Sequence, residues 1–167
     1  MSAVTTERTS GNANPLDLLE EIVSANEWAF QRMGEDEILV SLGGRWCDYQ
    51  LHFGWCHEIS ALQFACSLDM RVPAEKRAPV SELLALVNAR LWIGHFDLVF
   101  EEGTPAFRQT VLLRGADRLS VEQLEDLMDI GVVECERFYP AFQFLIWAGK
   151  SPADAIAAAM LDTVGEA

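Results

Sequence analysis

The sequence predicts an α+β domain in which helices cover mainly one face of a twisted antiparallel sheet of about five strands. Apolar residues recur at helical spacing in some segments and at every second position in others. The alternating segments come in neighbouring pairs separated by short turns, which is typical of antiparallel hairpins. The expected order of elements is α-β-β-β-α-β-β-α-α.

The domain organisation follows from length and composition. Residues 1–13 are polar without a periodic pattern, so we expect a disordered leader before one domain over residues 14–167. With 167 residues, 50% of them hydrophobic, the chain can bury a core without disulfides or metals. No signal peptide or membrane-spanning segment is recognisable, so we expect a cytoplasmic protein.

The net charge of the chain excludes some classes of binding partner. Twelve Lys and Arg residues against 26 Asp and Glu residues give a net charge of -14, which repels nucleic-acid phosphates and anionic lipids. We therefore expect neither nucleic acid nor membrane as a partner. Basic or apolar segments of another protein fit better, although a solvated acidic surface with no specific partner is the alternative.

The first helix is expected to begin at Asn14, whose side chain can cap it, with Pro15 at the first helical position. Helical spacing of apolar residues continues through Asn26 to Phe30, so the helix is expected to end near Met33. A strand over residues 37–42 follows.

A hairpin is predicted from two alternating stretches, residues 47–53 and 62–68, around a loop at 54–59. One face of this hairpin is apolar and the other is more polar, as in a sheet covered on one side. Counting outward from the loop pairs apolar residues with each other: Leu51 with Leu62, Tyr49 with Phe64, and Cys47 with Cys66. We expect the two cysteines to be reduced and packed beneath the helices.

The second half of the chain is expected to contain a helix, a second hairpin and two further helices. A helix is expected to open at Pro79, and strands over 95–100 and 107–114 should flank a turn at 101–106. Ser120 begins a capping-box pattern, and Ser151 precedes a final Ala-rich helix. The helix after Ser120 carries an apolar seam formed by Leu124, Met128, Gly131, Cys135, Phe138, Phe142 and Leu145.

Three of the four cysteines and two of the three histidines lie within residues 45–66. Their spacing lacks the paired ligands of a structural zinc site, so we expect no metal and no cofactor. Cys56 is the candidate exposed thiol. Together with His57 it defines the alternative function, a thiol-based enzyme or redox sensor.

An aromatic cluster at residues 138–147 supplies more apolar side chains than one helix face can bury. Tyr139, Phe144 and Trp147 point away from the seam and are the candidate interface residues. The alternative is that the last helix folds back and covers them.

The resemblance to a known family rests on two stretches, LWIGHFDLVFEEGTPAFRQTVLLRG (91–115) and EQLEDLMDIGVVECERFYPAFQFLIWAGKSPADAIAAAMLDTVGEA (122–167). They resemble the alphaproteobacterial branch of the YbjN-domain family, described as bacterial sensory transduction regulators, and the resemblance extends over residues 15–167. It implies a fold similar to type III secretion chaperones, in proteins that commonly dimerise. It implies no catalytic residues.

These observations favour a non-enzymatic, acidic and homodimeric regulator or chaperone-like protein that binds another protein or peptide. The thiol-based enzyme or sensor at Cys56 and His57 is the first alternative, and a small-molecule-binding regulator is the second.

Overall fold

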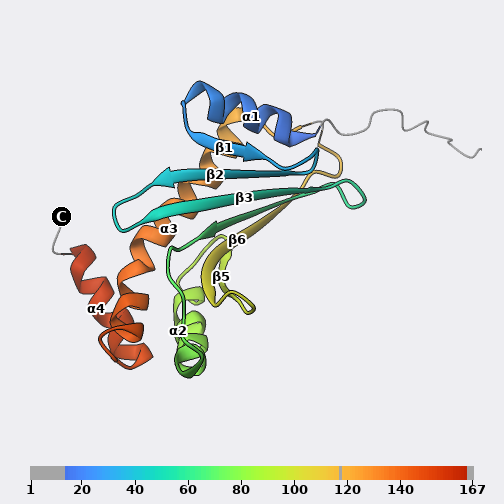
Figure 1. Cartoon of the computed structure of the whole chain (residues 1–167). Helices are drawn as coiled ribbons and strands as arrows, with labels where there is room; N and C mark the ends of the chain where they lie inside the picture. Colours follow the sequence, from blue (N-terminus) through green and yellow to red (C-terminus); the bar gives the residue numbers. More distant parts are fainter. Residues whose placement is uncertain (1–13, 117, 165–167) are drawn as a thin grey trace, which may run out of the picture.

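The computed structural model describes residues 14–116 and 118–164, so the expected leader at 1–13 lies outside the described residues. Within them, six strands form one antiparallel sheet in the order β1-β2-β3-β4-β6-β5 (Figure 1). The elements are α1 (Pro15–Ala25), β1 (Ala29–Arg32), β2 (Glu37–Gly43), β3 (Asp48–Cys56), β4 (Ala61–Ser67), a short 3-10 turn (Ala74–Lys76), α2 (Arg77–Asn88), β5 (His95–Val99), β6 (Thr104–Leu112), α3 (Val121–Ile146) and α4 (Pro152–Val164).

The α+β class is confirmed, but the first helix is shorter than predicted and the sheet has one more strand. Helix α1 ends at Ala25, because the Asn26 side chain caps the Ile22 carbonyl and Glu27 adopts a φ of 58°. The next residues form β1, which pairs Phe30 with Val40 of β2. The prediction failed because apolar positions that fit a helix here also fit a short strand.

The first hairpin has the predicted faces but not the predicted pairs. The connecting turn is shorter than residues 54–59, because Trp55 and Cys56 still belong to β3. The register places Phe53 opposite Phe64 and Leu51 opposite Cys66, a slide of four residues. A slide by an even number of residues keeps every side chain on its face, since the side-chain period of a strand is two.

The slide also separates the two cysteines that were expected to face each other. Cys47 precedes β3, and Cys66 lies opposite Leu51, so the predicted Cys47–Cys66 pair is wrong. All four cysteines are free thiols. Cys66 is buried beneath the helices as predicted, whereas Cys47 is half-buried.

The second hairpin is tighter than expected. Residues 104–106, placed in the turn from sequence, belong to β6, whereas Phe100, expected to end the preceding strand, lies in the turn and is 73% exposed. The shorter turn requires a residue with positive φ, and Gly103 adopts a φ of 71° there. Strand β6 then lies between β4 and β5, and α2 begins two residues before Pro79.

The long helix α3 follows the prediction closely. Ser120 Oγ accepts a hydrogen bond from the Gln123 amide at 3.1 Å, and Oε1 of Gln123 accepts one from the Ser120 amide at 2.9 Å. All seven residues of the predicted seam are buried. Gly131 brings the helix close to β4, because a Cβ there would lie 2.4 Å from the Phe64 ring.

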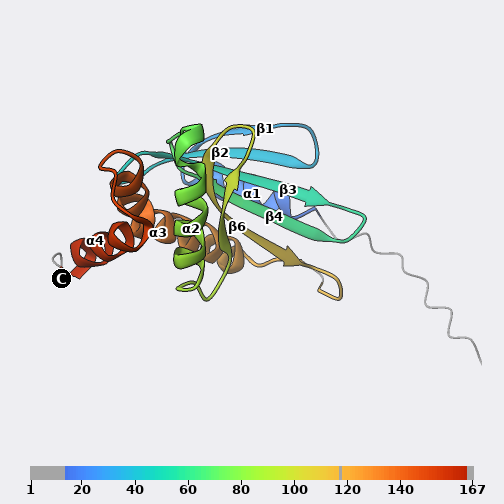
Figure 2. The same ribbon diagram turned by 90° about the horizontal axis from the view of Figure 1, so that it is seen from below.

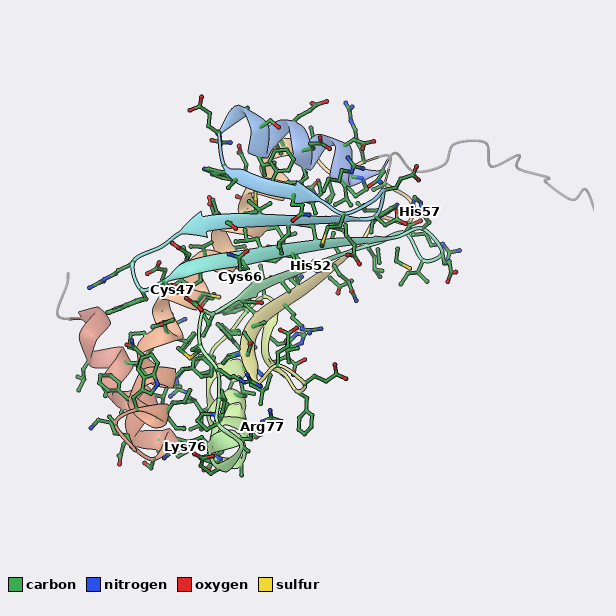
Figure 3. The ribbon with its side chains drawn as sticks, in the orientation of Figure 1. Cys47, His52, His57, Cys66, Lys76 and Arg77 are labelled. Carbon is green, nitrogen blue, oxygen red and sulfur yellow. The ribbon has the colours of Figure 1, made fainter. Side chains whose placement is uncertain are left out.

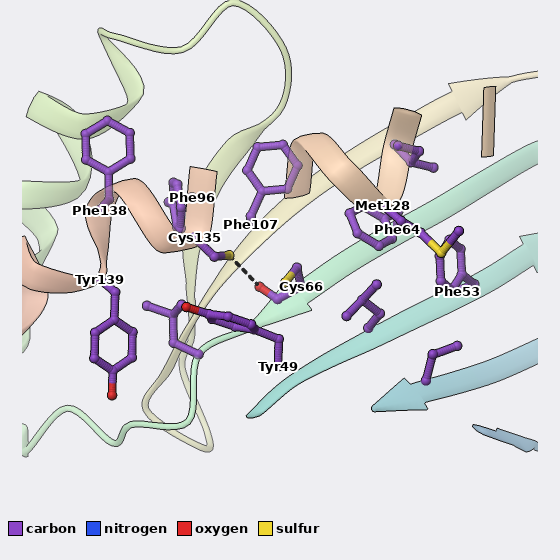
Figure 4. Close-up of a cluster of buried hydrophobic side chains, with 14 of the residues drawn as sticks. Tyr49, Phe53, Phe64, Cys66, Phe96, Phe107, Met128, Cys135, Phe138 and Tyr139 are labelled. Atoms are coloured by element: carbon purple, nitrogen blue, oxygen red, sulfur yellow. Dashed lines mark hydrogen bonds between the residues drawn. The ribbon is translucent and has the colours of Figure 1, made fainter. Parts of the chain in front are cut away.

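The core lies between α3 and one face of the sheet (Figure 4). Aromatic rings are its largest components: the Phe96 ring centroid lies 5.7 Å from that of Phe107 and 5.9 Å from that of Phe138. Such edge-on contacts are favoured by the ring quadrupoles. We call this sheet face the covered face.

The helices gather on the covered face. In Figure 1, α3 runs behind the sheet, and α1 is drawn next to β1. Helix α1 also contacts β2, β3 and α3. Viewed from below in Figure 2, α2 stands beside β5 and α4 packs against α3 at one end. The described helices pack on the covered face through the residues of the core. We call the opposite face of the sheet the open face. None of the described helices is long and apolar enough to cross a membrane.

Candidate functional site

The cysteines and histidines of residues 45–66 do not converge on one point. Figure 3 shows Cys47 and His57 at opposite ends of β3, with His52 between them. His52 and Cys66 lie on opposite faces of the sheet, as their registers require. The described residues contain no group of three His, Cys, Asp or Glu side chains that could hold a metal ion.

His57 is occupied by partners other than Cys56. Its Nε2 lies 2.7 Å from Oδ1 of Asp36, and its Nδ1 accepts a hydrogen bond from Trp55 Nε1 at 3.0 Å. Because an indole nitrogen can only donate, Nδ1 carries no proton, and Nε2 donates to Asp36. Both ring nitrogens are thereby used, which leaves none to activate the half-buried Cys56 thiol.

Cys47 and Cys135 are unsuited to nucleophilic chemistry because desolvation raises the pKa of both thiols. Burial raises the pKa of Cys135, whose Sγ lies 3.6 Å from the Cys66 carbonyl oxygen (Figure 4). Burial also raises the pKa of Cys47. A higher thiol pKa lowers the population of thiolate, which is the reactive form.

The candidate interface residues differ in their exposure. Tyr139 is only 4% exposed and stacks against Trp46, with ring centroids 6.1 Å apart. The Trp46 indole nitrogen donates to the Glu136 carbonyl at 3.1 Å, which fixes the β2–β3 loop against α3. Tyr139 is therefore a core residue, and its expected surface position is wrong. Burial raises its pKa.

Phe144 and Trp147 remain candidates for a surface contact. Phe144 is half-buried, with the Lys150 ammonium 5.8 Å from its ring centroid. Trp147 follows α3 and is 63% exposed. Helix α4 packs against α3 but leaves this indole uncovered. The alternative that the last helix covers the aromatic cluster therefore holds for only part of the cluster.

The open face contains a concave cavity of about 630 Å³, which we call the trough. Its floor is formed by small residues of β4, Ala65 and Ser67, and its sides by longer side chains from the strands on either side. These flanking side chains include Gln50 and His52 of β3, Thr104 and Arg108 of β6, and Asp48, Asp69 and Glu102 at one end.

Strand alternation places these residues together. His52 lies opposite Ala65, and Ala65 lies opposite Arg108, so the three form a row across three strands. Gln50 and Ser67 form the neighbouring row. Because the residues between them point to the covered face, each strand contributes one side chain in two to the trough.

Charge in the trough is mixed. Three carboxylates, Asp48, Asp69 and Glu102, and one guanidinium, Arg108, line it. In the described part of the chain, no Lys or Arg forms an ion pair with any of these three carboxylates. The trough therefore presents ionic groups that are open to a ligand.

The alternation of residues in the first hairpin predicts its polar face but not the trough. The alternation of Asp48, Gln50 and His52 was a visible signal. Arg108 could not be added to it, because the pairing of β4 with β6 instead of β5 is a long-range choice that local patterns do not record.

Comparison with known proteins agrees with the resemblance noted from the sequence. Residues 15–144 match the YbjN family, described as "Putative bacterial sensory transduction regulator". The structure is similar to the crystal structure of YbjN from E. coli, described as "a putative transcription regulator", with 13% identity and a TM-score of 0.48 over 72% of this chain and 90% of that one. No curated protein matches the chain. From the span of the family match, the chain belongs to the YbjN family.

Proposed function

We propose that this protein is a cytoplasmic, non-enzymatic regulator that binds an extended segment of another protein in the trough. The carrying observation is the one-sided arrangement of the fold. The large apolar side chains of β3 and β4 face α3, while the opposite face of the same strands presents a polar cavity of about 630 Å³ with a floor of small residues. Small residues between longer ones leave room for a peptide backbone to approach.

The arrangement of His57 supports a binding function over the thiol-based alternative. A nucleophilic cysteine needs an imidazole within hydrogen-bond reach. Here the imidazole is held by Asp36 and Trp55, and the pKa of the buried thiol Cys135 is raised. The regulator description of the family agrees with a binding role.

A protein segment of mixed or basic character fits the charge of the chain. The net charge of -14 would attract basic segments, and three carboxylates against one guanidinium give the trough the same bias. A small molecule in the same cavity is the competing occupant.

Self-association through Trp147 is the second part of the proposal. An indole that is 63% exposed at the end of α3 is costly to leave in water and is typical of an interface. Light scattering at low micromolar concentration should give twice the 18.6 kDa mass of the chain, and Trp147→Ala should shift it toward the monomer. A monomeric mass for the unaltered protein would contradict dimerisation.

Selection from a displayed random peptide library tests the binding function. We expect the protein to enrich a family of peptides that Ala65→Trp no longer binds, because the indole would fill the floor of the trough. Ala157→Trp, at an exposed position of α4, is the matched control and should retain binding. Enrichment that survives Ala65→Trp would contradict a peptide site in the trough.

A further inference from the structure

The two ends of the trough carry opposite charge. Arg108 lies in the row that also contains His52 and, on the far side, His95 of β5. Asp48 lies four residues from His52 along β3, and Glu102 is close in sequence to Thr104, which lies four residues from Arg108 along β6. Asp69 lines the acidic end as well. The guanidinium of Arg108 therefore lies at the end of the trough opposite the three carboxylates, and we call these the basic end and the acidic end. At the basic end, His52 Nε2 also lies 3.7 Å from Oε2 of Glu37.

The separation of the two ends follows from strand geometry. A strand rises about 3.3 Å per residue, so four residues along β3 or β6 correspond to about 13 Å. A compact zwitterion, such as a free amino acid, is too short to contact both ends. An extended peptide has the same rise per residue as the strands beneath it and can match this distance.

The guanidinium of Arg108 is only weakly engaged within the chain. Its Nε is buried, and no described residue accepts a hydrogen bond from it. The nearest carboxylate is that of Asp97, whose Oδ2 lies 3.7 Å away and whose Oδ1 accepts a hydrogen bond from the Leu98 amide at 2.8 Å. With 43% of its side chain exposed, Arg108 can present donors to a carboxylate that enters the trough.

We propose that the trough selects extended segments in which a basic and an acidic residue stand four positions apart. The inference rests on the proposed function and adds the chemistry of the occupant. In an extended chain, residues four apart lie on the same face and about 13 Å from each other. The acidic residue would contact Arg108, and the basic one would contact Asp48, Asp69 and Glu102. Either order along the peptide is allowed, because the segment can run in both directions.

The test uses labelled ten-residue peptides of polar, uncharged background that carry one Lys and one Glu. In one set the two charges are four positions apart, and in the other they are three apart, which places them on opposite faces of an extended chain. Fluorescence polarisation should show about two- to fivefold tighter binding for spacing four, as expected for partly exposed ion pairs. The difference should vanish near 1 M salt, where the screening length is about 3 Å.

Substitutions in the protein test which end of the trough contacts the Lys of the peptide and which contacts the Glu. Arg108→Gln should abolish the preference for Glu over Gln in the peptide while retaining the preference for Lys. The double variant Asp69→Asn/Glu102→Gln should do the reverse. Arg114→Gln, at an exposed position beyond β6, is the control and should change neither preference. Unchanged unfolding midpoints would verify that the variants are folded.

The outcomes separate this inference from the proposed function. Peptides that bind and are lost with Ala65→Trp, but show equal affinity at spacings three and four, would overturn the charge spacing alone. No binding of the spacing-four peptides at millimolar concentration would also overturn it. If Arg108→Gln instead alters the mass of the protein in light scattering, the trough is occupied by a second copy of the chain, and the proposal is wrong.

Discussion

The two faces of β4 meet different surroundings. Phe64 and Cys66 point to α3 and are at most 1% exposed, whereas Ala65 and Ser67, which alternate with them, line the trough. The same strand thus contributes to the core on one side and to a candidate binding surface on the other. Stability and recognition can therefore be altered independently here, because neighbouring residues face different environments.

The largest expected effect comes from the covered face. Phe64→Ala should lower the free energy of unfolding by about 3–5 kcal/mol, because it removes a buried ring that contacts Phe53 and Phe107. Gln63→Ala, one residue away on the open face, should change it by about 0.5 kcal/mol or less. Urea unfolding of both variants measures the contrast. Equal losses would show that the two faces are not energetically distinct.

The close approach of α3 to the covered face should reverse the usual effect of a Gly→Ala substitution on stability. In a helix interior, Gly→Ala normally stabilises by about 1 kcal/mol. Gly131→Ala should instead destabilise by about 1–3 kcal/mol, because the new Cβ would lie 2.4 Å from the Phe64 ring.

A second substitution, at Phe64, tests whether the clash with this ring causes the loss of stability. Phe64→Leu in the Gly131→Ala background should cost less than Phe64→Leu alone, since the smaller side chain relieves the clash. A double-mutant cycle from denaturant unfolding gives the coupling. Additive losses would mean that the helix and strand do not press on each other at this point.

The buried thiol of Cys135 predicts a decline of stability in alkaline solution. Burial raises its pKa in the folded state, so above the unfolded value of about 8.5 the unfolded chain binds fewer protons than the folded one. The free energy of unfolding should then fall by up to about 1.4 kcal/mol per pH unit for this group, with the stabilisation fully present below pH 8.5.

Cys135→Ala isolates this contribution. The variant should be somewhat less stable at pH 7, but its stability should fall less steeply between pH 8.5 and 9.5 than that of the unaltered protein. Unfolding curves at several pH values give both slopes. Parallel slopes would indicate that Cys135 is not the group that titrates.

The smallest effect is expected at Cys56. Cys56→Ser should change stability by about 0.5 kcal/mol or less and leave peptide binding intact, because the thiol is half-buried at the end of β3 and His57 is held by other partners. Unfolding and polarisation measurements on the variant check both. Loss of binding would favour the thiol-based alternative.

Local patterns predicted much of the covered face. The seam of α3, the capping box at Ser120 and the faces of β3 and β4 each depend on spacing within one segment, and all are observed. The predicted register of the first hairpin was wrong by four residues. Alternation fixes which face a residue occupies but not which partner it meets, so it could not choose between registers that differ by an even number of residues.

The trough depends on long-range choices that local patterns do not contain. Residues 29–32 were assigned to a helix, because Phe30 satisfies both periods and the turn at Glu27 relies on a positive φ that non-glycine residues rarely adopt. Arg108 joins His52 only because β6 pairs with β4. The alternation of Asp48, Gln50 and His52 was visible in the sequence, but the strand pairing that places Arg108 in the same row as His52 was not.

The position of a bound peptide decides whether the trough on the open face is the binding site. Backbone amide chemical shifts of the labelled protein, followed by NMR while a selected peptide is added, should move at His52, Ala65 and Arg108, which lie side by side on three strands of the open face. Amides along the α3 seam should stay in place. Shifts concentrated at Phe144 and Trp147, with none in the trough, would contradict the assignment of binding to the open face.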